Sequence, residues 1–259
     1  MRPDEQTRQL QSQMGRASAS VGALAAALLP VLFDPEDPLA SLDQWASRVS
    51  TLTIRAGART MALAQHDYMR TRVATVGTPI RWVPDPPVPE RIKSSLLSTS
   101  GQTIMQGLDT YEVALKRARI QASGVAIRHS MNAARNSTIA TVKTDPDVIG
   151  AVYLTRGDDD VCSWCMMLAS RGPVFKEHSF WHSNELFRGE GTAKSHDFCR
   201  CVIRVVGSED APLLAQARDL YENGWLPATK GHSGRNALNA WRRHVYAQRK
   251  SLGAAPTVS

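Results

Sequence analysis

All four cysteines of the 259-residue chain lie in Cys162-Ser163-Trp164-Cys165 and His196-Asp197-Phe198-Cys199-Arg200-Cys201. The two runs are separated by the thirty residues 166–195. Thiols gathered into two close clusters, with a histidine in the second, usually meet in space. We therefore expect the stretch from Val161 to Val202 to bring its two clusters together in one cysteine-rich core.

A structural zinc site is the first interpretation of this pattern. Zinc takes four Cys or His ligands in a tetrahedron, and a Cys-x-x-Cys turn supplies two thiolates at a suitable separation. Five residues compete for the four places: Cys162, Cys165, His196, Cys199 and Cys201. Cys199 and Cys201 point to the same side if their segment is a strand, so both could reach one ion. A reduced thiol cluster without metal and disulfide pairing remain as alternatives.

Nucleophilic catalysis is the second interpretation of the same residues. The candidate pairs are Cys165 with His196 as its base, and Ser195 with a nearby histidine. The sequence shows neither an orienting acid nor an oxyanion hole at fixed spacing. His178 and His182 lack the Glu of a His-Glu-x-x-His motif, so we interpret them as surface or packing residues.

The amino-acid composition limits which classes of protein and of binding partner are compatible with the chain. Hydrophobic residues make up 42% and charged residues 21% of the chain, which argues against wholesale disorder. The net charge is +7, and from Arg218 onward seven Lys and Arg stand against Asp219 and Glu222. A basic C-terminal segment favours contact with nucleic acid or with an acidic protein surface. A purely solubilising role fits it equally well.

The apolar run Val21–Phe33 does not predict a secretory signal or a membrane span. Its thirteen residues are too few to cross a bilayer, and Pro30 interrupts them. We therefore expect no membrane contact and a cytoplasmic protein. In that compartment thiols stay reduced, and clustered cysteines bind metal more often than they form disulfides.

The pattern along the chain predicts an α+β protein that is mainly α. Residues 1–145 are expected to form a helical module with a proline-rich connector near 78–90, residues 146–208 the cysteine-rich α+β core, and residues 209–259 basic helices and a mobile tail. The expected helices are Thr7–Leu29, Ser41–Val76, Thr103–Val142, Val161–Arg171, Phe180–Phe187 and Asn236–Lys250, and the expected strands are Val148–Leu154 and Phe198–Val206.

Side chains that carry no chemistry in this interpretation are assigned to the core or to solvent. The basic residues of the helix Thr103–Val142, Arg135 among them, are expected to lie on a solvated face. Tryptophans 164, 181, 225 and 241 are expected to anchor the core or an interface, and the acidic run 158–160 to be solvated.

Residues Leu154–Cys165, followed by His196-x-x-Cys199-x-Cys201, resemble the cysteine-rich core of MuF-like minor head proteins of tailed phages. Residues Met166–Phe175 resemble in particular the versions found in phages of actinobacteria. The likeness covers about Asp147–Val206, and long helices before the core also suit this family. Asp197 is a departure, because many members carry a proline after the histidine.

The resemblance implies a low-copy minor capsid protein that acts in head morphogenesis near the portal, or travels with the DNA. Its location would be the interior of the virion head, and the host cytoplasm during assembly. Its expected partners are the portal protein and the major capsid or scaffold protein, with non-specific DNA contact through the basic C-terminal helix. Similar phage genes are described as capsid maturation proteases, which makes that activity the alternative. A zinc-bearing nucleic-acid-binding protein is the second alternative.

Overall fold

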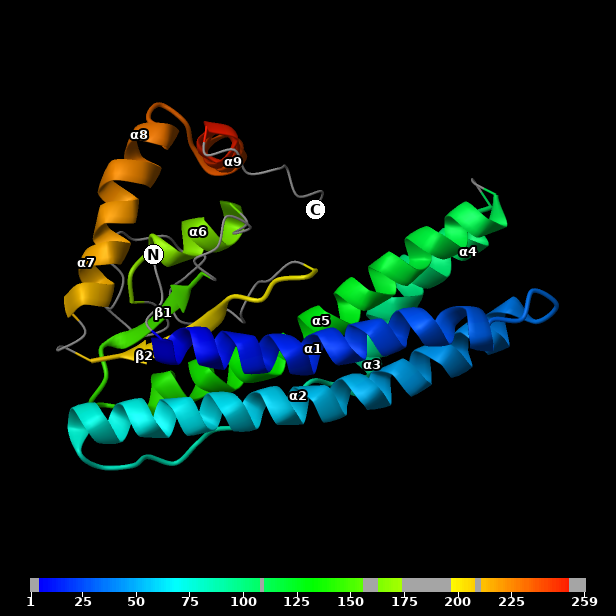
Figure 1. Ribbon diagram of the computed structural model, residues 1–259, viewed down its shortest axis with the longest axis horizontal. Coiled ribbons are helices and arrows are strands. Elements are labelled where there is room, and N and C mark those ends of the chain that lie inside the picture. The colour runs from blue at the N-terminus through cyan, green and yellow to red at the C-terminus, as the bar shows by residue number, and fades with distance from the viewer. Residues whose placement is uncertain (1–4, 108–109, 156–162, 174–196, 208–210, 252–259) are drawn as a thin grey trace.

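The computed structural model describes residues 5–107, 110–155, 163–173, 197–207 and 211–251 (Figure 1). The described chain is mainly helical with one two-stranded antiparallel sheet, which confirms the expected fold class. The helices are α1 (Glu5–Leu32), α2 (Pro38–Val76), α3 (Pro89–Leu96), α4 (Gln102–Met105), α5 (Tyr111–Thr144), α6 (Ser163–Ala169), α7 (Ala211–Asp219), α8 (Leu226–Thr229) and α9 (Gly234–Ser251), with π-helical turns η1 (Leu97–Gly101) and η3 (Leu220–Trp225). The strands are β1 (Gly150–Leu154) and β2 (Val202–Val206).

Helices α1 and α2 lie side by side along the long axis of the molecule and are joined by a tight turn at one end (Figure 1). The turn forms where the sequence has Asp34–Pro38, as its prolines predict. Asp37 caps α2, because its carboxylate accepts a hydrogen bond of 3.3 Å from the backbone N–H of Ala40. At the other end α2 stops at Gly77, whose positive φ of 83° closes the helix on Val73.

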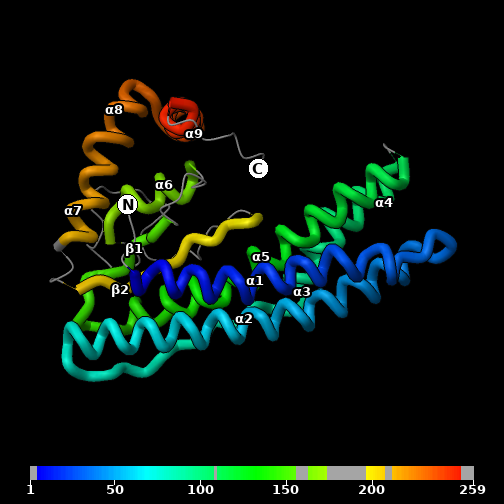
Figure 2. The backbone as a smooth tube through the Cα atoms, in the orientation of Figure 1, coloured from blue at the N-terminus to red at the C-terminus, as the bar shows by residue number. Residues whose placement is uncertain are grey.

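The long helices bury a continuous apolar interior. Helix α5 packs against both α1 and α2, and Trp45 of α2 donates its indole N–H to the backbone oxygen of Ala25 in α1, at 3.2 Å. The buried core residues at this end are Val21, Ala25, Leu29, Leu42, Trp45, Ala46, Val49, Ile92, Leu96, Ala118, Ala122, Val125 and Ala126. The smooth path of the chain in Figure 2 shows α5 running back from the far end of this helical arm towards the sheet.

The sheet closes against the start of α1 and the end of α5. Strands β1 and β2 pair from Gly150↔Val206 to Leu154↔Val202. Gln11 of α1 donates its side-chain amide to the backbone oxygens of Leu154 and Thr155, both at 3.0 Å. One buried cluster combines Ile139 of α5, Tyr153 of β1 and Trp241 of α9. Apolar clusters therefore cross the expected boundaries at 145 and 208, and the three-unit division of the chain stays a prediction.

Two expected elements are wrong in their bounds. The single helix Thr103–Val142 is divided: α4 ends at Met105 and α5 begins at Tyr111, because Gly107 has a left-handed φ of 59° that a helix does not accept. The expected strand Phe198–Val206 begins only at Val202, since Phe198 has a φ of 62°. The expected helix Phe180–Phe187 lies outside the described residues.

Aromatic side chains attach the C-terminal helices to α6, as expected for Trp225 and Trp241. The indole N–H of Trp241 donates to the backbone oxygen of Ser163 at 2.7 Å, and the rings of Trp225 and Trp241 lie 5.6 Å apart. The buried guanidinium of Arg171 stacks over Trp225 at 4.3 Å. Trp164 is partly buried against the same cluster, whereas Trp181 lies outside the described residues.

Helix α1 is long and apolar enough to cross a membrane by length and composition. The helix spans 28 residues, more than the apolar run in the sequence suggests. The core helix of a soluble protein satisfies the same criterion, and 39% of the apolar window of α1 is buried inside the molecule. The absence of membrane contact stays a prediction.

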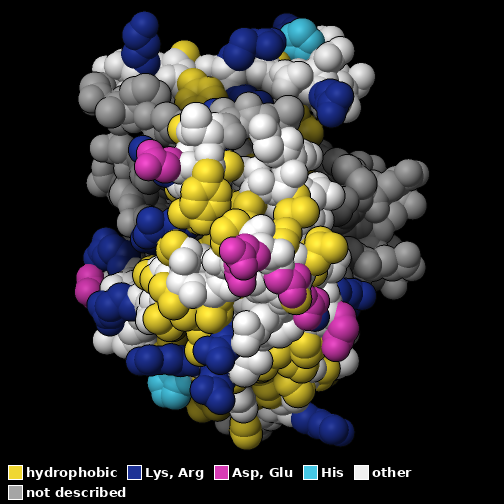
Figure 3. Space-filling view, turned by 90° about the vertical axis from the view of Figure 1, so that its right-hand side faces the viewer, with side chains coloured by type: hydrophobic (Ala, Val, Ile, Leu, Met, Phe, Trp, Pro, Cys, Tyr) yellow, Lys and Arg dark blue, Asp and Glu magenta, His cyan; other side chains and the backbone are white. Residues whose placement is uncertain are grey.

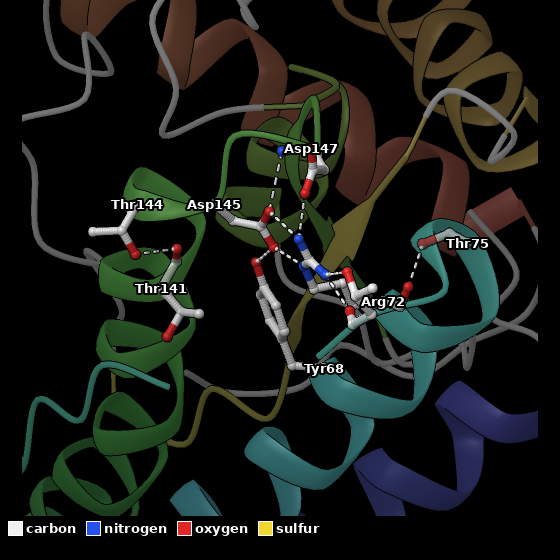
Figure 4. Close-up of polar contacts among 8 residues, drawn as sticks. Tyr68, Arg72, Thr75, Thr141, Thr144, Asp145 and Asp147 are labelled. Atoms are coloured by element: carbon white, nitrogen blue, oxygen red, sulfur yellow. Dashed lines mark hydrogen bonds and ion pairs between the residues drawn. The ribbon is translucent and has the colours of Figure 1, made fainter. Parts of the chain in front are cut away.

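A buried ion-pair network joins the end of α2 to the end of α5 (Figure 4). Arg72 donates from Nε to Asp145 Oδ2 at 2.7 Å and also contacts the carboxylate of Asp147. The hydroxyl of Tyr68 donates to the same Oδ2 at 2.9 Å. Burial alone would raise the pKa of Asp145, but the hydrogen bonds from Arg72, from the backbone N–H of Asp147 and from Tyr68 outweigh it and lower that pKa. Burial and the negative Asp145 raise the pKa of Tyr68, so its hydroxyl stays a donor.

The far end of the helical arm exposes apolar side chains beside acidic ones (Figure 3). Val31 is 75% exposed, Leu39 71% and Tyr111 51%. Asp34, Glu36 and Asp37 occupy the turn between α1 and α2 at this end. This end of the arm is thus both apolar and negatively charged.

Gly124→Ala in α5 is expected to destabilise the protein by about 1–3 kcal/mol, as overpacking does. An added Cβ would lie 2.8 Å from the Cβ of Asp197 and 2.9 Å from Cε2 of Phe198. The matched control is Gly15→Ala in α1, where the nearest atom is Cδ of Arg200 at 3.9 Å and the helix gains up to about 1 kcal/mol. Urea unfolding measures both, and stabilisation by Gly124→Ala would contradict the close approach of the two segments.

Candidate metal centre

Three cysteine thiols meet where α6, α5 and the segment before β2 come together. Cys165 lies in α6, and Cys199 and Cys201 lie in the segment that leads into β2. They are 1%, 4% and 5% exposed, respectively. Their Sγ atoms all lie within 4.8 Å of one another, and those of Cys165 and Cys199 are 3.3 Å apart. The structure therefore confirms that the two cysteine clusters of the sequence meet in space.

Neighbouring elements hold the two sides of the cluster in place. The indole of Trp241 fixes the start of α6 at Ser163, two residues before Cys165. On the other side, the left-handed backbone at Phe198 turns the chain immediately before Cys199. Asp197 pairs with Arg128 of α5 at 3.3 Å, which fastens this turn to the helix. The thiols thus sit between parts of the fold that are separately anchored.

Arg135 of α5 supplies a buried positive charge beside the thiols. Its side chain is 1% exposed, and its Nη2 donates to the backbone oxygens of Cys199 at 2.9 Å and Cys201 at 2.7 Å. The same nitrogen contacts Sγ of Cys199 at 3.2 Å. Burial acts to lower the pKa of Arg135, but its electrostatic interaction with Cys199, Cys165 and Cys201 raises it above its usual value. The arginine therefore stays charged, and a positive charge beside a cysteine favours its thiolate form.

The arrangement is suited to holding a metal ion. Thiolates bind metal in their deprotonated form, which the adjacent guanidinium favours. In a tetrahedral zinc site with Zn–S distances of about 2.3 Å, the sulfurs lie about 3.8 Å apart. The described sulfur separations, from 3.3 Å to at most 4.8 Å, bracket that value. Three buried cysteines close together could thus bind a metal.

The other expected site residues lie outside the described part of the chain. These are Cys162 and His196 of the metal set, Ser195 and His196 of the catalytic set, and also His178, His182 and the acidic run 158–160. Their assignments stay predictions. Among the candidates for catalysis only Cys165 is described, and its side chain is buried.

The sequence interpretation placed Arg135 wrongly, on a solvated face of its helix. The correct position has a signal in the spacing: Arg135 follows the buried Met131 by four residues, so it continues the apolar stripe of the helix. A charge on such a stripe requires buried acceptors. Here the acceptors are the backbone oxygens of the cysteine segment, which the sequence pattern of α5 does not reveal.

Comparison with known proteins identifies the family of the chain. A family model described as VG15 protein matches residues 1–225, from α1 to the end of η3. The match covers the long helices and the thiol cluster and ends before α8 and α9. No curated protein and no solved structure matches the chain. Because the model spans 225 of 259 residues, the chain belongs to the VG15 protein family and is a phage-related viral protein.

Proposed function

We propose that this protein is a minor head protein of a tailed phage, of the MuF-like type, with a cysteine core that is structural. The observation that carries this proposal is the position of the thiols. They lie at the junction of α5, α6 and the β2 segment, at most 5% exposed, where they can tie elements together but offer little surface to a substrate. The family match to a phage-related protein supports the same context.

The proposed core is a zinc site with Cys165, Cys199 and Cys201 as three of its four ligands. Cys162 and His196 are the two candidates for the fourth place. Three thiolates leave the site with excess negative charge, which the buried Arg135 offsets. Zinc bound there would supply cross-linking energy to a small sheet that has two strands.

Protein purified under reducing conditions is expected to contain about one zinc per chain, because three cysteine sulfurs already lie close together. Chelation should lower the melting temperature, and Cys199→Ser should abolish metal retention. Separate Cys162→Ser and His196→Asn variants identify the fourth ligand as the one whose loss weakens binding. Zinc content far below one per chain, together with melting unchanged by chelation, would reject the zinc site.

The alternative of a capsid maturation protease has no specific support among the described residues. Cys165 is 1% exposed. The charged group that contacts the thiol cluster is the guanidinium of Arg135, which cannot act as a general base. Incubation with the cognate scaffold and major capsid proteins tests this activity directly. Defined fragments that disappear in a Ser195→Ala or His196→Ala variant would establish the protease instead.

Protein composition of purified virions tests the proposed role. Quantitative mass spectrometry is expected to detect this chain at a copy number comparable to that of the portal protein and far below that of the major capsid protein. A phage lacking the gene should yield defective heads. Absence of the chain from both virions and procapsids would contradict the proposal, as would a copy number equal to that of the major capsid protein.

The proposed partners and location follow from this role. The portal protein and the major capsid or scaffold protein are the proposed contacts, inside the head or in the host cytoplasm during assembly. Helix α9 carries Arg235, Arg242, Arg243, Arg249 and Lys250 and is the proposed element for non-specific contact with DNA. Contact with phosphates must weaken as salt rises, so an affinity independent of salt would remove DNA from this set of partners.

A further inference from the structure

A groove of about 690 Å³ runs between α1 and α2 on the outer face of the helical arm. Its apolar lining comes from both helices: Ala17, Val21, Leu24, Leu52, Ala56 and Leu63. Three exposed arginines border it, Arg16 from α1 and Arg55 and Arg59 from α2. The groove combines an apolar floor with a positively charged rim.

The groove lies on the side of the helix pair that faces away from α5. On α1, Gly22 approaches Ser123 and Ile127 of α5, and on α2, Gly57 approaches Ala133 of α5. Residues two positions away on an α-helix point about 200° round the axis. Leu24 lies two positions from Gly22, and Arg55 and Arg59 lie two positions either side of Gly57. Helix α5 therefore covers one side of the pair and leaves the other side open.

The charge of the groove is not balanced within the helices that form it. Residues 6–32 and 44–66 contain no Asp or Glu. In the described part of the chain, no ion pair involves Arg16, Arg55 or Arg59. Arg55 and Arg59 are also i, i+4 neighbours, a like-charge arrangement that destabilises a helix. The positive rim is thus unfavourable for the isolated chain and complementary to a negative partner.

We propose that this groove binds an acidic amphipathic helix of a partner protein. The groove residues Gln13 to Leu24 extend over about 16 Å, roughly three turns of a helix. A guest helix would place apolar residues at i, i+3, i+4 and i+7 on the floor and carboxylates against the arginines. It would pack as a fourth helix on α1 and α2, opposite α5. The apolar floor favours such a helix over a nucleic-acid backbone, which has no apolar stripe to bury.

A synthetic helical peptide of about 18 residues, with a Leu/Ala stripe flanked by Glu, is the probe. Fluorescence anisotropy against the full chain is expected to show binding that weakens as salt rises. The variant Arg55→Gln/Arg59→Gln should bind about tenfold more weakly, from two lost exposed ion pairs. The matched control Arg48→Gln/Arg91→Gln removes two exposed arginines from outside the groove and should bind like the natural chain.

A second probe peptide, with every Glu replaced by Lys, separates charge recognition from simple apolar contact and is expected not to bind. Equal binding of both peptides would overturn the proposal, as would equal weakening by the two double variants. Two other occupants are distinguished in the same experiments. In either case the acidic peptide fails to bind while the chain binds a DNA duplex or associates with itself. If that interaction is lost in Arg55→Gln/Arg59→Gln, the proposal is also overturned. The proposal does not depend on the zinc site or on the role in the phage head.

Discussion

Arg72→Met is expected to lower the free energy of unfolding by about 3–5 kcal/mol, because it leaves a buried carboxylate without its counter-charge. The side chains of Arg72 and Asp145 are 4% and 0% exposed. Asp145 also follows the last residue of α5, where the helix dipole is unfavourable to a negative charge. Methionine preserves much of the apolar stem of arginine, so the lost stability is due to the missing charge rather than to a cavity. Denaturant unfolding measures it.

The control for this variant is Arg48→Met on the same helix. Arg48 is exposed, so the same substitution should change stability by less than about 0.5 kcal/mol. Equal effects of the two variants would show that the network in Figure 4 contributes no stability. Tyr68→Phe removes one hydrogen bond to Asp145 and should cost about 1–3 kcal/mol, as for a bond to a charged group.

Acid should reduce the difference between the natural chain and Arg72→Met. The pKa of Asp145 is lowered in the folded protein, so its contribution is present above the unfolded pKa of about 4 and is lost as the pH falls through the folded pKa. Without Arg72, burial raises the pKa of Asp145, and protonation removes the uncompensated charge at a higher pH. Unfolding measured between neutral pH and pH 3 checks this convergence. A difference independent of pH would assign the loss to packing.

Arg135→Leu is expected to be similarly severe, with a loss of about 3–5 kcal/mol, because two buried carbonyl oxygens lose their donors. Arg135 donates to the backbone oxygens of Cys199 and Cys201. The side chain is buried, so water cannot replace it as the donor. The segment that carries both cysteines should loosen. The greater accessibility of its thiols is expected to raise their reaction with a disulfide reagent above that in Arg72→Met, which loses a similar amount of stability at another site.

The matched control is Arg128→Leu, on the same helix and against the same segment. The ion pair of Arg128 with Asp197 has side chains 27% and 35% exposed, so its loss should cost less than about 1 kcal/mol. Arg135→Lys keeps the positive charge but replaces the planar guanidinium with a single ammonium group. Its loss of stability should lie between those of the two leucine variants. If Arg128→Leu and Arg135→Leu destabilise equally and leave thiol reactivity unchanged, Arg135 does not hold the cluster.

The helices were predictable from local patterns that the structure retains. Helix α2 has its apolar residues at helical spacing, with Asp37 and Pro38 at its start and Gly77 after its end. The meeting of the cysteine clusters was predictable from their spacing, because two close pairs in a chain without other cysteines have few alternatives. Strand β1 was predicted with its correct end and with a start two residues too early.

Three features were not predictable from one sequence. The partners of Arg135 are main-chain oxygens of residues 64 and 66 positions away, and backbone acceptors carry no sequence signal. The network of Arg72 joins residues 73 and 75 positions apart, and each of its members alone is typical of a solvated charge. Phe198 adopts a left-handed φ that its residue type disfavours, so no local sequence signal showed that the strand begins later than expected.

The hydrogen bonds of Gln11 to residues 154 and 155 have a consequence for the order of events during synthesis. The first helix must wait for a partner that lies 143 residues later in the chain. At translation rates of about 5–20 residues per second, that interval lasts roughly 7–30 s. Throughout it, Leu10 and Met14 of α1, which are buried in the folded protein, lack the strands that cover them. The nascent helical arm is therefore exposed to aggregation for far longer than a local hairpin would be, and a binding partner or chaperone that shields α1 should raise the yield of folded protein.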